Sequence, residues 1–230
     1  MLKTLNKILT SNNVVDRFYD EYNGNSQFYN WLNSILPEVK KCEEKEQNNP
    51  WHKYNVLGHI LHSVEEMNKQ TVSLDEIERK MLAFVMFLHD IGKPDKHIVR
   101  MKDGVLIDSF FNHNIRSEEI ARKFLPQVGF NDKEVNIMCM LILKHDIFMF
   151  IKEEKANNPH WKTLTREVVE DEISELNQVG DGQKLMKDLV MVGRSDSLAQ
   201  NEKMTKAPLK MLDKFERILE EILNEKIDIV

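Results

Sequence analysis

The stretch FLHDIGKP, residues 87–94, closes an apolar run, MLAFVMFL, that starts at Met81. His89 and Asp90 place an imidazole beside a carboxylate at the end of this run, and a glycine and a lysine follow within the next three residues. An apolar run of this length is typical of a helix in the core. Because a buried carboxylate requires a partner of opposite charge, the pair indicates a cation site at the end of a core helix.

Most of the chain is patterned for amphipathic helices. Apolar residues recur mainly at spacings of three and four, most clearly between Val56 and Met67. A capping side chain stands three residues before a glutamate at Ser73 and again at Asn131, which predicts helix starts near residues 74 and 132. The large aromatic residues are expected in the core, among them Phe84, Phe87, Phe110 and Phe111.

One stretch alternates between apolar and polar residues instead. Residues 97–109 read HIVRMKDGVLIDS and contain Asp103-Gly104, a strong signal for a two-residue hairpin turn. We therefore predict an all-α fold, a helical bundle with a small β-hairpin insertion near residues 97–109.

The polar stretch KKCEEKEQNNP, residues 40–50, indicates a linker. It separates an N-terminal helical segment, residues 1–40, from a main domain, residues 41–205. The last segment, residues 206–230, is predicted to form an amphipathic helix that packs on the body, with a dimer contact as the alternative.

Composition limits the class of protein. The net charge of −6, from 38 acidic and 32 basic residues, gives no overall positive field for nucleic acid or an anionic membrane. The two cysteines form no CxxC motif, which favours a reduced, cytoplasmic protein. The N-terminus is too polar for a signal peptide, and no segment approaches the ~20 apolar residues of a transmembrane helix. We expect a cytoplasmic protein without membrane contact, and its oligomeric state stays open.

Four residues qualify as metal ligands beside the central pair. His59 stands one step off the apolar stripe of its helix, His113 opens a helix after the hairpin, and His145 ends an apolar run. Asp196 lies in a late helix that follows an apolar segment. Singly, such a histidine more often caps a helix, and such an aspartate is usually solvated. Together they predict a ligand set of His59, His89, Asp90, His113, His145 and Asp196.

Mixed imidazole and carboxylate ligation suits iron, manganese, nickel or zinc, with magnesium as an alternative. Six ligands are too many for one catalytic ion with open positions, so two divalent ions fit better, with Asp90 as the bridge. A two-metal site would supply a water that is activated near neutral pH. We assign catalytic roles to Asp90 and to Lys93, whose ammonium is expected to stabilise charge on a phosphate.

The order His59, His89-Asp90, Asp196 resembles the HD superfamily of metal-dependent phosphohydrolases. In that resemblance His113 and His145 match the extra ligands of two-metal members, and Asp146 is similar to an outer ligand. A closer likeness covers roughly residues 33–200 and is to the HD half of bacterial tRNA nucleotidyltransferases and poly(A) polymerases. Its segments are NSILPEV, EQNNPWHKYNVLGHILHSV, FLHDIGKP, FNHN and LKHD, in that order.

The resemblance implies a phosphohydrolase that acts on a nucleotide or an RNA end, of the 2′,3′-cyclic phosphate or nucleoside monophosphate type, with tRNA as a candidate partner. The chain departs from the family in having no Gly-rich loop followed by paired aspartates, so we do not expect nucleotide addition. It also has no Gly-Tyr-Pro signature, which speaks against cyclic-di-GMP. Two alternatives stay open: a non-catalytic HD-fold module that binds RNA or a partner protein, and a hydrolase of free nucleotides.

Overall fold

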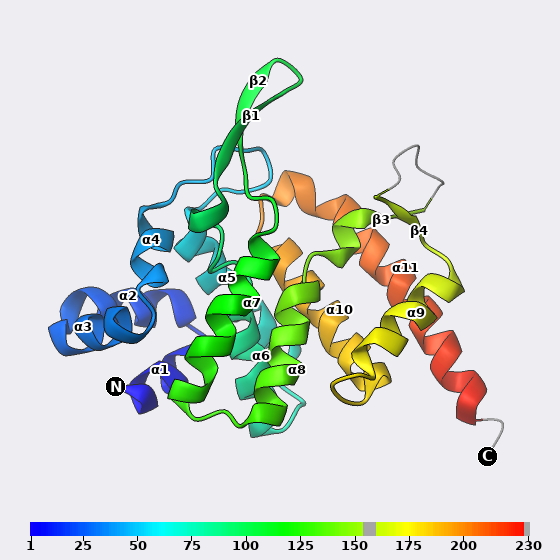
Figure 1. Ribbon diagram of the computed structural model, residues 1–230, viewed down its shortest axis with the longest axis horizontal. Coiled ribbons are helices and arrows are strands. Elements are labelled where there is room, and N and C mark those ends of the chain that lie inside the picture. The colour runs from blue at the N-terminus through cyan, green and yellow to red at the C-terminus, as the bar shows by residue number, and fades with distance from the viewer. Residues whose placement is uncertain (154–159, 228–230) are drawn as a thin grey trace.

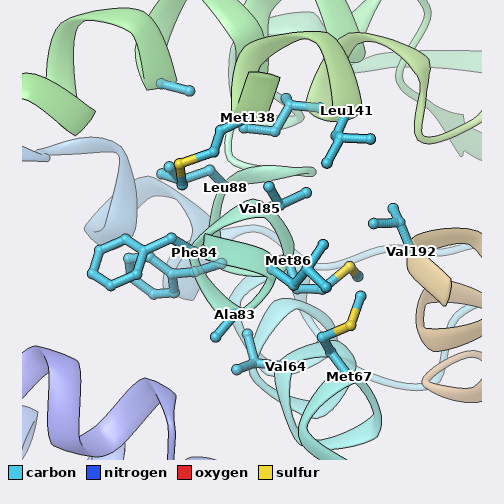
Figure 2. Close-up of a cluster of buried hydrophobic side chains, with 14 of the residues drawn as sticks. Val64, Met67, Ala83, Phe84, Val85, Met86, Leu88, Met138, Leu141 and Val192 are labelled. Atoms are coloured by element: carbon cyan, nitrogen blue, oxygen red, sulfur yellow. The ribbon is translucent and has the colours of Figure 1, made fainter. Parts of the chain in front are cut away.

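Helix α6 (Glu76–Leu88) is the centre of the fold, because the residues from Leu82 to Leu88 are all buried. A helix that is apolar on every side needs neighbours all around it. Figure 2 shows its side chains against Val64 and Met67, Met138 and Leu141, and Val192, which belong to three other helices. The sequence run that precedes His89 therefore holds the centre of the core, and the end of this helix is rigidly placed.

The structure, a computed structural model, describes residues 1–153 and 160–227, without the side chains of residues 226 and 227. Within these ranges the other helices are α1 (Leu2–Leu9), α2 (Val14–Gly24), α3 (Ser26–Ile35), α4 (Glu38–Glu44), α5 (Val56–Gln70), α7 (His113–Phe124), α8 (Asp132–Lys144), α9 (Arg166–Leu176), α10 (Gly182–Leu198) and α11 (Glu202–Ile227). Three short 3-10 helices lie at Pro94–Lys96, Leu125–Val128 and Ile147–Phe150. The protein is mainly helical, as predicted.

The helices form a central group with a flank on each side (Figure 1). Helices α5 to α8 form the central group, α1 to α4 lie on one flank, and α9 to α11 lie on the other. Apolar side chains of α1 to α4 join the same buried cluster as those of α5 to α8. The predicted division of the chain into segments at residues 40 and 205 stays a prediction. Residues 154–159 of the predicted main domain and residues 228–230 of the predicted last helix lie outside the described residues.

The predicted hairpin is present as β1 (Ile98–Lys102) and β2 (Val105–Ser109), which pair antiparallel. Asp103 and Gly104 both have positive φ, 49° and 80°, which is the conformation that a two-residue type I′ turn requires. The hairpin projects away from the helices (Figure 1). A second pair of strands, β3 (Ile151–Lys152) and β4 (Lys162–Thr163), is parallel and two residues long, and it was not predicted.

Three boundary predictions differ from the structure. Helix α4 occupies much of the predicted linker, because Val39 and Cys42, one turn apart, are both buried in the core. Helix α6 starts at Glu76 and is capped by Asp75 in place of Ser73. Helix α11 starts at Glu202, before Pro208, because Asn201 caps its first turn by accepting from the Lys203 N–H.

The other sequence predictions about helix starts and buried side chains are mostly confirmed. Asn131 and Glu134 form a complete capping box at the start of α8. The apolar stripe of α11 packs on the body through Leu212, Phe215, Leu219 and Ile222. Phe84, Phe87 and Phe110 are buried, but Phe111 is 58 % exposed, so its assignment to the core was wrong. Phe111 lies in the turn before α7, next to Asn112, which has a positive φ of 60°.

Among the described helices, none is both long and apolar enough to cross a lipid bilayer.

Helix α10 buries one carboxyl group away from the candidate site, that of Asp188. Burial raises the pKa of Asp188 from its ordinary 3.8 to about 6, although Lys184 lies 3.8 Å away. Because the folded-state pKa lies above the unfolded value, the folded protein binds this proton more tightly. The protonated carboxyl group of Asp188 therefore stabilises the folded state fully below about pH 4, and this stabilisation is lost as the pH rises past 6.

We expect Asp188→Asn to raise the free energy of unfolding by about 1–3 kcal/mol at pH 7.5 and to have little effect near pH 4. Urea unfolding of the variant and the wild type at both pH values measures the difference. Glu220→Gln, on an exposed position of α11, is the matched control for loss of one negative charge. A variant that is less stable than the wild type at pH 7.5 contradicts the expectation.

Candidate metal centre

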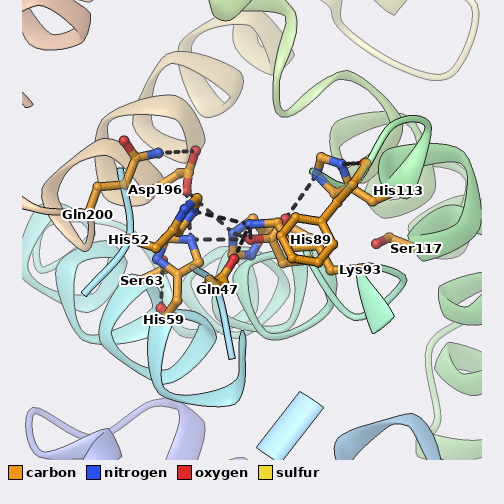
Figure 3. A network of polar contacts seen from close by, with 12 residues as sticks. Gln47, His52, His59, Ser63, His89, Lys93, His113, Ser117, Asp196 and Gln200 are labelled. Atoms are coloured by element: carbon orange, nitrogen blue, oxygen red, sulfur yellow. Dashed lines mark hydrogen bonds and ion pairs between the residues drawn. The ribbon is translucent and has the colours of Figure 1, made fainter. Parts of the chain in front are cut away.

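The six predicted ligands come together at one end of the helical bundle. His89 and Asp90 follow the last residue of α6, His145 follows α8, and His113 is the first residue of α7. His59 lies in the first turns of α5 and Asp196 near the end of α10. Figure 3 labels four of them, His59, His89, His113 and Asp196, and shows their side chains gathered in one region between the helices. Residues that are up to 137 positions apart in the sequence thus form one cluster.

The cluster divides into two groups that share Asp90. The ligand atoms of each group lie within 4.8 Å of one another, and the groups are His59, His89, Asp90, Asp196 and Asp90, His113, His145. Asp146, the predicted outer ligand, belongs to neither.

The two carboxylate oxygens of Asp90 face different groups. Oδ2 lies 3.2 Å from His59 Nε2 and 3.3 Å from His89 Nε2. Oδ1 lies 3.0 Å from His113 Nε2 and 3.6 Å from His145 Nε2. Such an arrangement is what a carboxylate that bridges two cations requires.

Three imidazoles are oriented by the backbone of their own helix end. In each, Nδ1 donates to a carbonyl three residues earlier: His89 to Met86 at 2.6 Å, His113 to Phe110 at 2.8 Å, and His145 to Ile142 at 2.7 Å. A hydrogen bond at Nδ1 leaves the lone pair on Nε2, which points into the cluster. This is the tautomer in which a histidine binds a metal through Nε2.

The described residues leave several buried atoms of the cluster without a hydrogen-bond partner. These are His89 Nε2 and His59 Nδ1, and Asp90 Oδ2 also accepts no hydrogen bond of good geometry although Lys93 pairs with it as a cation. In addition, His113 Nε2 and His145 Nε2 face each other at 3.1 Å, although both should carry lone pairs. Each unsatisfied buried group costs about 1–3 kcal/mol, and two facing lone pairs need a cation or a proton between them. The residues therefore fit divalent cations bound by nitrogen and oxygen ligands.

The charges of the cluster shift its pKa values strongly. Burial alone would raise the pKa of Asp90, but the positive charges of His89 and Lys93 hold it well below its ordinary range. Burial alone would lower the pKa of His89, but Asp90 and then Asp196 raise it to about 9. Without a cation, a proton on His89 thus balances the carboxylates, and a bound cation would have to replace this proton.

Lys93, predicted to be catalytic, lies beside Asp90 and is only 5 % exposed. Its Nζ is 2.5 Å from Asp90 Oδ2. It also donates to Gln47 Oε1 at 3.0 Å and contacts His52 Nε2 at 3.2 Å. The ring of Phe110 covers it at 5.6 Å.

Gln47 and His52 were not predicted as site residues. Both lie in the loop between α4 and α5, where no apolar periodicity points to burial. His52 stands seven positions before His59. Because α5 begins only at Val56, helical spacing does not relate the two side chains. The only signal in the sequence is that both residues lie in the stretch EQNNPWHKYNVLGHILHSV, which also carries His59.

Gly92 lets helix α7 come close to the turn after α6. A Cβ atom at Gly92 would lie 2.6 Å from the Ser117 nitrogen and 2.7 Å from the His113 oxygen. The Gly92 N–H donates to Ser117 Oγ at 2.9 Å. The glycine thereby sets how near His113 approaches Asp90.

The sequence matches no model of a known protein family.

Proposed function

We propose that this chain is a metal-dependent phosphohydrolase of the HD type, with residues 41–205 as its HD domain. The observation that carries the proposal is Asp90, whose two oxygens are divided between two groups of buried ligands. His59, His89, Asp90 and Asp196 would hold one ion, and Asp90, His113 and His145 a second. When bound, the two ions would supply a water activated near neutral pH and positive charge for a phosphate oxygen.

The chain's own residues prepare this centre. The carbonyl groups at the ends of α6 and α8 fix the tautomers of His89 and His145, so that their Nε2 atoms are ready to bind. Lys93 places one further positive charge beside Asp90, which favours a phosphate in this region. The buried ligands are His59, His89, Asp90 and His145, and their burial excludes bulk water from the carboxylate bridge.

The ligand chemistry favours iron, manganese, nickel or zinc over magnesium, since four of the six ligands are imidazoles. The substrate we propose is a nucleotide or an RNA end with a phosphoester, such as a 2′,3′-cyclic phosphate. Arg100 and Lys102 on the hairpin support an anionic substrate. Their cationic groups lie over the rings of Phe111 and Trp51. These two residues are next in the sequence to Phe110 and His52, which contact Lys93.

The same cation and aromatic pairs favour a second candidate, a non-catalytic module that binds RNA. Arg100 lies 5.4 Å from the Phe111 ring and Lys102 lies 4.4 Å from the Trp51 ring. Interleaved cations and aromatic rings suit stacking with unpaired bases. Binding of a tRNA that falls steeply with salt, without any turnover, would favour this candidate.

Metal removal tests the proposed function. We expect the purified protein to contain a first-row transition metal and to hydrolyse bis(4-nitrophenyl) phosphate and adenosine 2′,3′-cyclic phosphate. Treatment with a chelator should abolish both activities, and added Mn²⁺ should restore them. Metal content is measured by mass spectrometry of the elements. A protein that binds no transition metal and turns over neither substrate contradicts the proposal.

A further inference from the structure

The ammonium of Lys93 lies close to acceptor atoms of three residues. Asp90 Oδ2 lies 2.5 Å from its Nζ. Lys93 also donates to Gln47 Oε1 and contacts His52 Nε2 (Figure 3). Its nitrogen is thereby surrounded by three acceptors, and a Lys side chain has three N–H donors. Two of its three N–H groups are directed to Gln47 and His52, and the ammonium as a whole is paired with the carboxylate of Asp90.

The contact with Asp90 differs in kind from the other two. Lys93 meets Asp90 Oδ2 as an ion pair, but no donor approaches this oxygen with hydrogen-bond geometry. The Lys93 hydrogen bonds go to Gln47 and His52. Lys93 thus neutralises the buried carboxylate and leaves a lone pair of Oδ2 free for a cation.

Gln47 and His52 belong to one loop, and hydrogen bonds anchor this loop at two points between them. Asn48 donates to Asp108 Oδ2 of β2 through its backbone N–H at 2.8 Å. In addition, the Asn201 N–H donates to the Trp51 carbonyl at 2.8 Å.

The acceptor atom of His52 is fixed by the loop as well. Its Nδ1 lies 2.8 Å from Asn49 Oδ1, an acceptor, so that Nδ1 carries the hydrogen and Nε2 carries the lone pair. The acceptors for Lys93 are therefore preset by structure outside the ligand groups.

We propose that Lys93 is a built-in counter-charge that competes with the cation for Asp90, and that Gln47 and His52 are its positioning residues. The proposal rests on the proposed function, since it concerns the affinity of that metal centre. Lys93 stabilises the metal-free protein by balancing Asp90. It weakens binding of the ion at His59, His89, Asp90 and Asp196, because this ion would share Oδ2 with the ammonium.

Lys93→Met keeps the length of the side chain and removes the charge. Because two positive charges on one oxygen repel each other, we expect the variant to bind Mn²⁺ at least about tenfold more tightly. Without metal, the same variant loses the partner of a buried carboxylate, and its Tm should fall by about 5–10 °C. The two effects have opposite signs, which a general packing defect would not produce.

Gln47→Met removes one acceptor and leaves the charge in place. Lys93 then depends more on Asp90, so Mn²⁺ affinity is expected to fall about three- to tenfold. The matched control is Lys96→Met, which removes an exposed cation three residues away and should change neither quantity.

The experiment titrates each full-length protein with Mn²⁺ against a fluorescent chelator and records Tm in chelator alone. Unchanged or weaker Mn²⁺ binding by Lys93→Met overturns the inference while the wild type still binds and hydrolyses. A wild type that binds no Mn²⁺ instead refutes the metal centre of the proposed function, and the inference with it. If Lys93→Met does not fold without metal, the Mn²⁺ affinity of Gln47→Met decides. Mn²⁺ binding by Gln47→Met that is tighter than, or equal to, that of the wild type refutes the inference.

Discussion

Asp90→Asn is expected to abolish stable binding of both ions and to lower phosphoester hydrolysis by more than about a hundredfold. Asparagine has almost the same shape, but it offers one carbonyl oxygen and an amide nitrogen that cannot act as a ligand. Asp90 Oδ1 and Oδ2 serve different groups, so one substitution affects both. Loss of an outer partner of a ligand typically costs ten- to a hundredfold in metal affinity or activity, and loss of the bridge should cost more.

The measurements are metal content per chain and hydrolysis of bis(4-nitrophenyl) phosphate, with circular dichroism to verify the fold. Asp188→Asn is the matched control, because it makes the same change at a buried aspartate outside both ligand groups. It should keep its metal and its activity. An Asp90→Asn protein that retains both ions and turns over at the wild-type rate would refute the role of Asp90 as the bridge.

Gly92→Ala is expected to separate the two groups of ligands. The new Cβ would lie 2.6 to 2.8 Å from backbone and side-chain atoms of α7, which cannot move without displacing His113. Overpacking of this kind costs about 1–3 kcal/mol of stability. Because His113 moves away from Asp90 Oδ1, the second ion should be lost or bound at least about tenfold more weakly. The ion at His59, His89, Asp90 and Asp196 should remain.

Calorimetric titration with Mn²⁺ distinguishes two bound ions from one, and urea unfolding measures the cost to stability. Gly24→Ala, at the end of α2, is the control, since a Cβ there meets no atom within 4 Å. If Gly92→Ala binds both ions as the wild type does, the close approach of α7 to Gly92 does not determine the ligand geometry of Asp90, His113 and His145.

Local signals in the sequence predicted the helical class, the hairpin and the candidate ligands. The hairpin turn depends on Asp103 and Gly104 alone, and the capping box of α8 on Asn131 and Glu134, so neighbouring residues are enough to predict them. The role of the loop after α4 was not predictable in this way. Val39 and Cys42 become helical and buried only because a core surface covers them.

The sequence by itself determined that a histidine and an aspartate follow the most apolar helix, and that four further candidate ligands occur near the ends of other helices or beside their apolar stripes. Only the tertiary structure decided how these side chains meet. It directs Oδ1 and Oδ2 of Asp90 toward different histidines, and it brings Gln47 and His52 to Lys93 across 46 and 41 positions of the chain. The physical reason is that the periodicity of apolar residues specifies which face of a helix is buried, whereas distances between polar atoms depend on how whole helices pack.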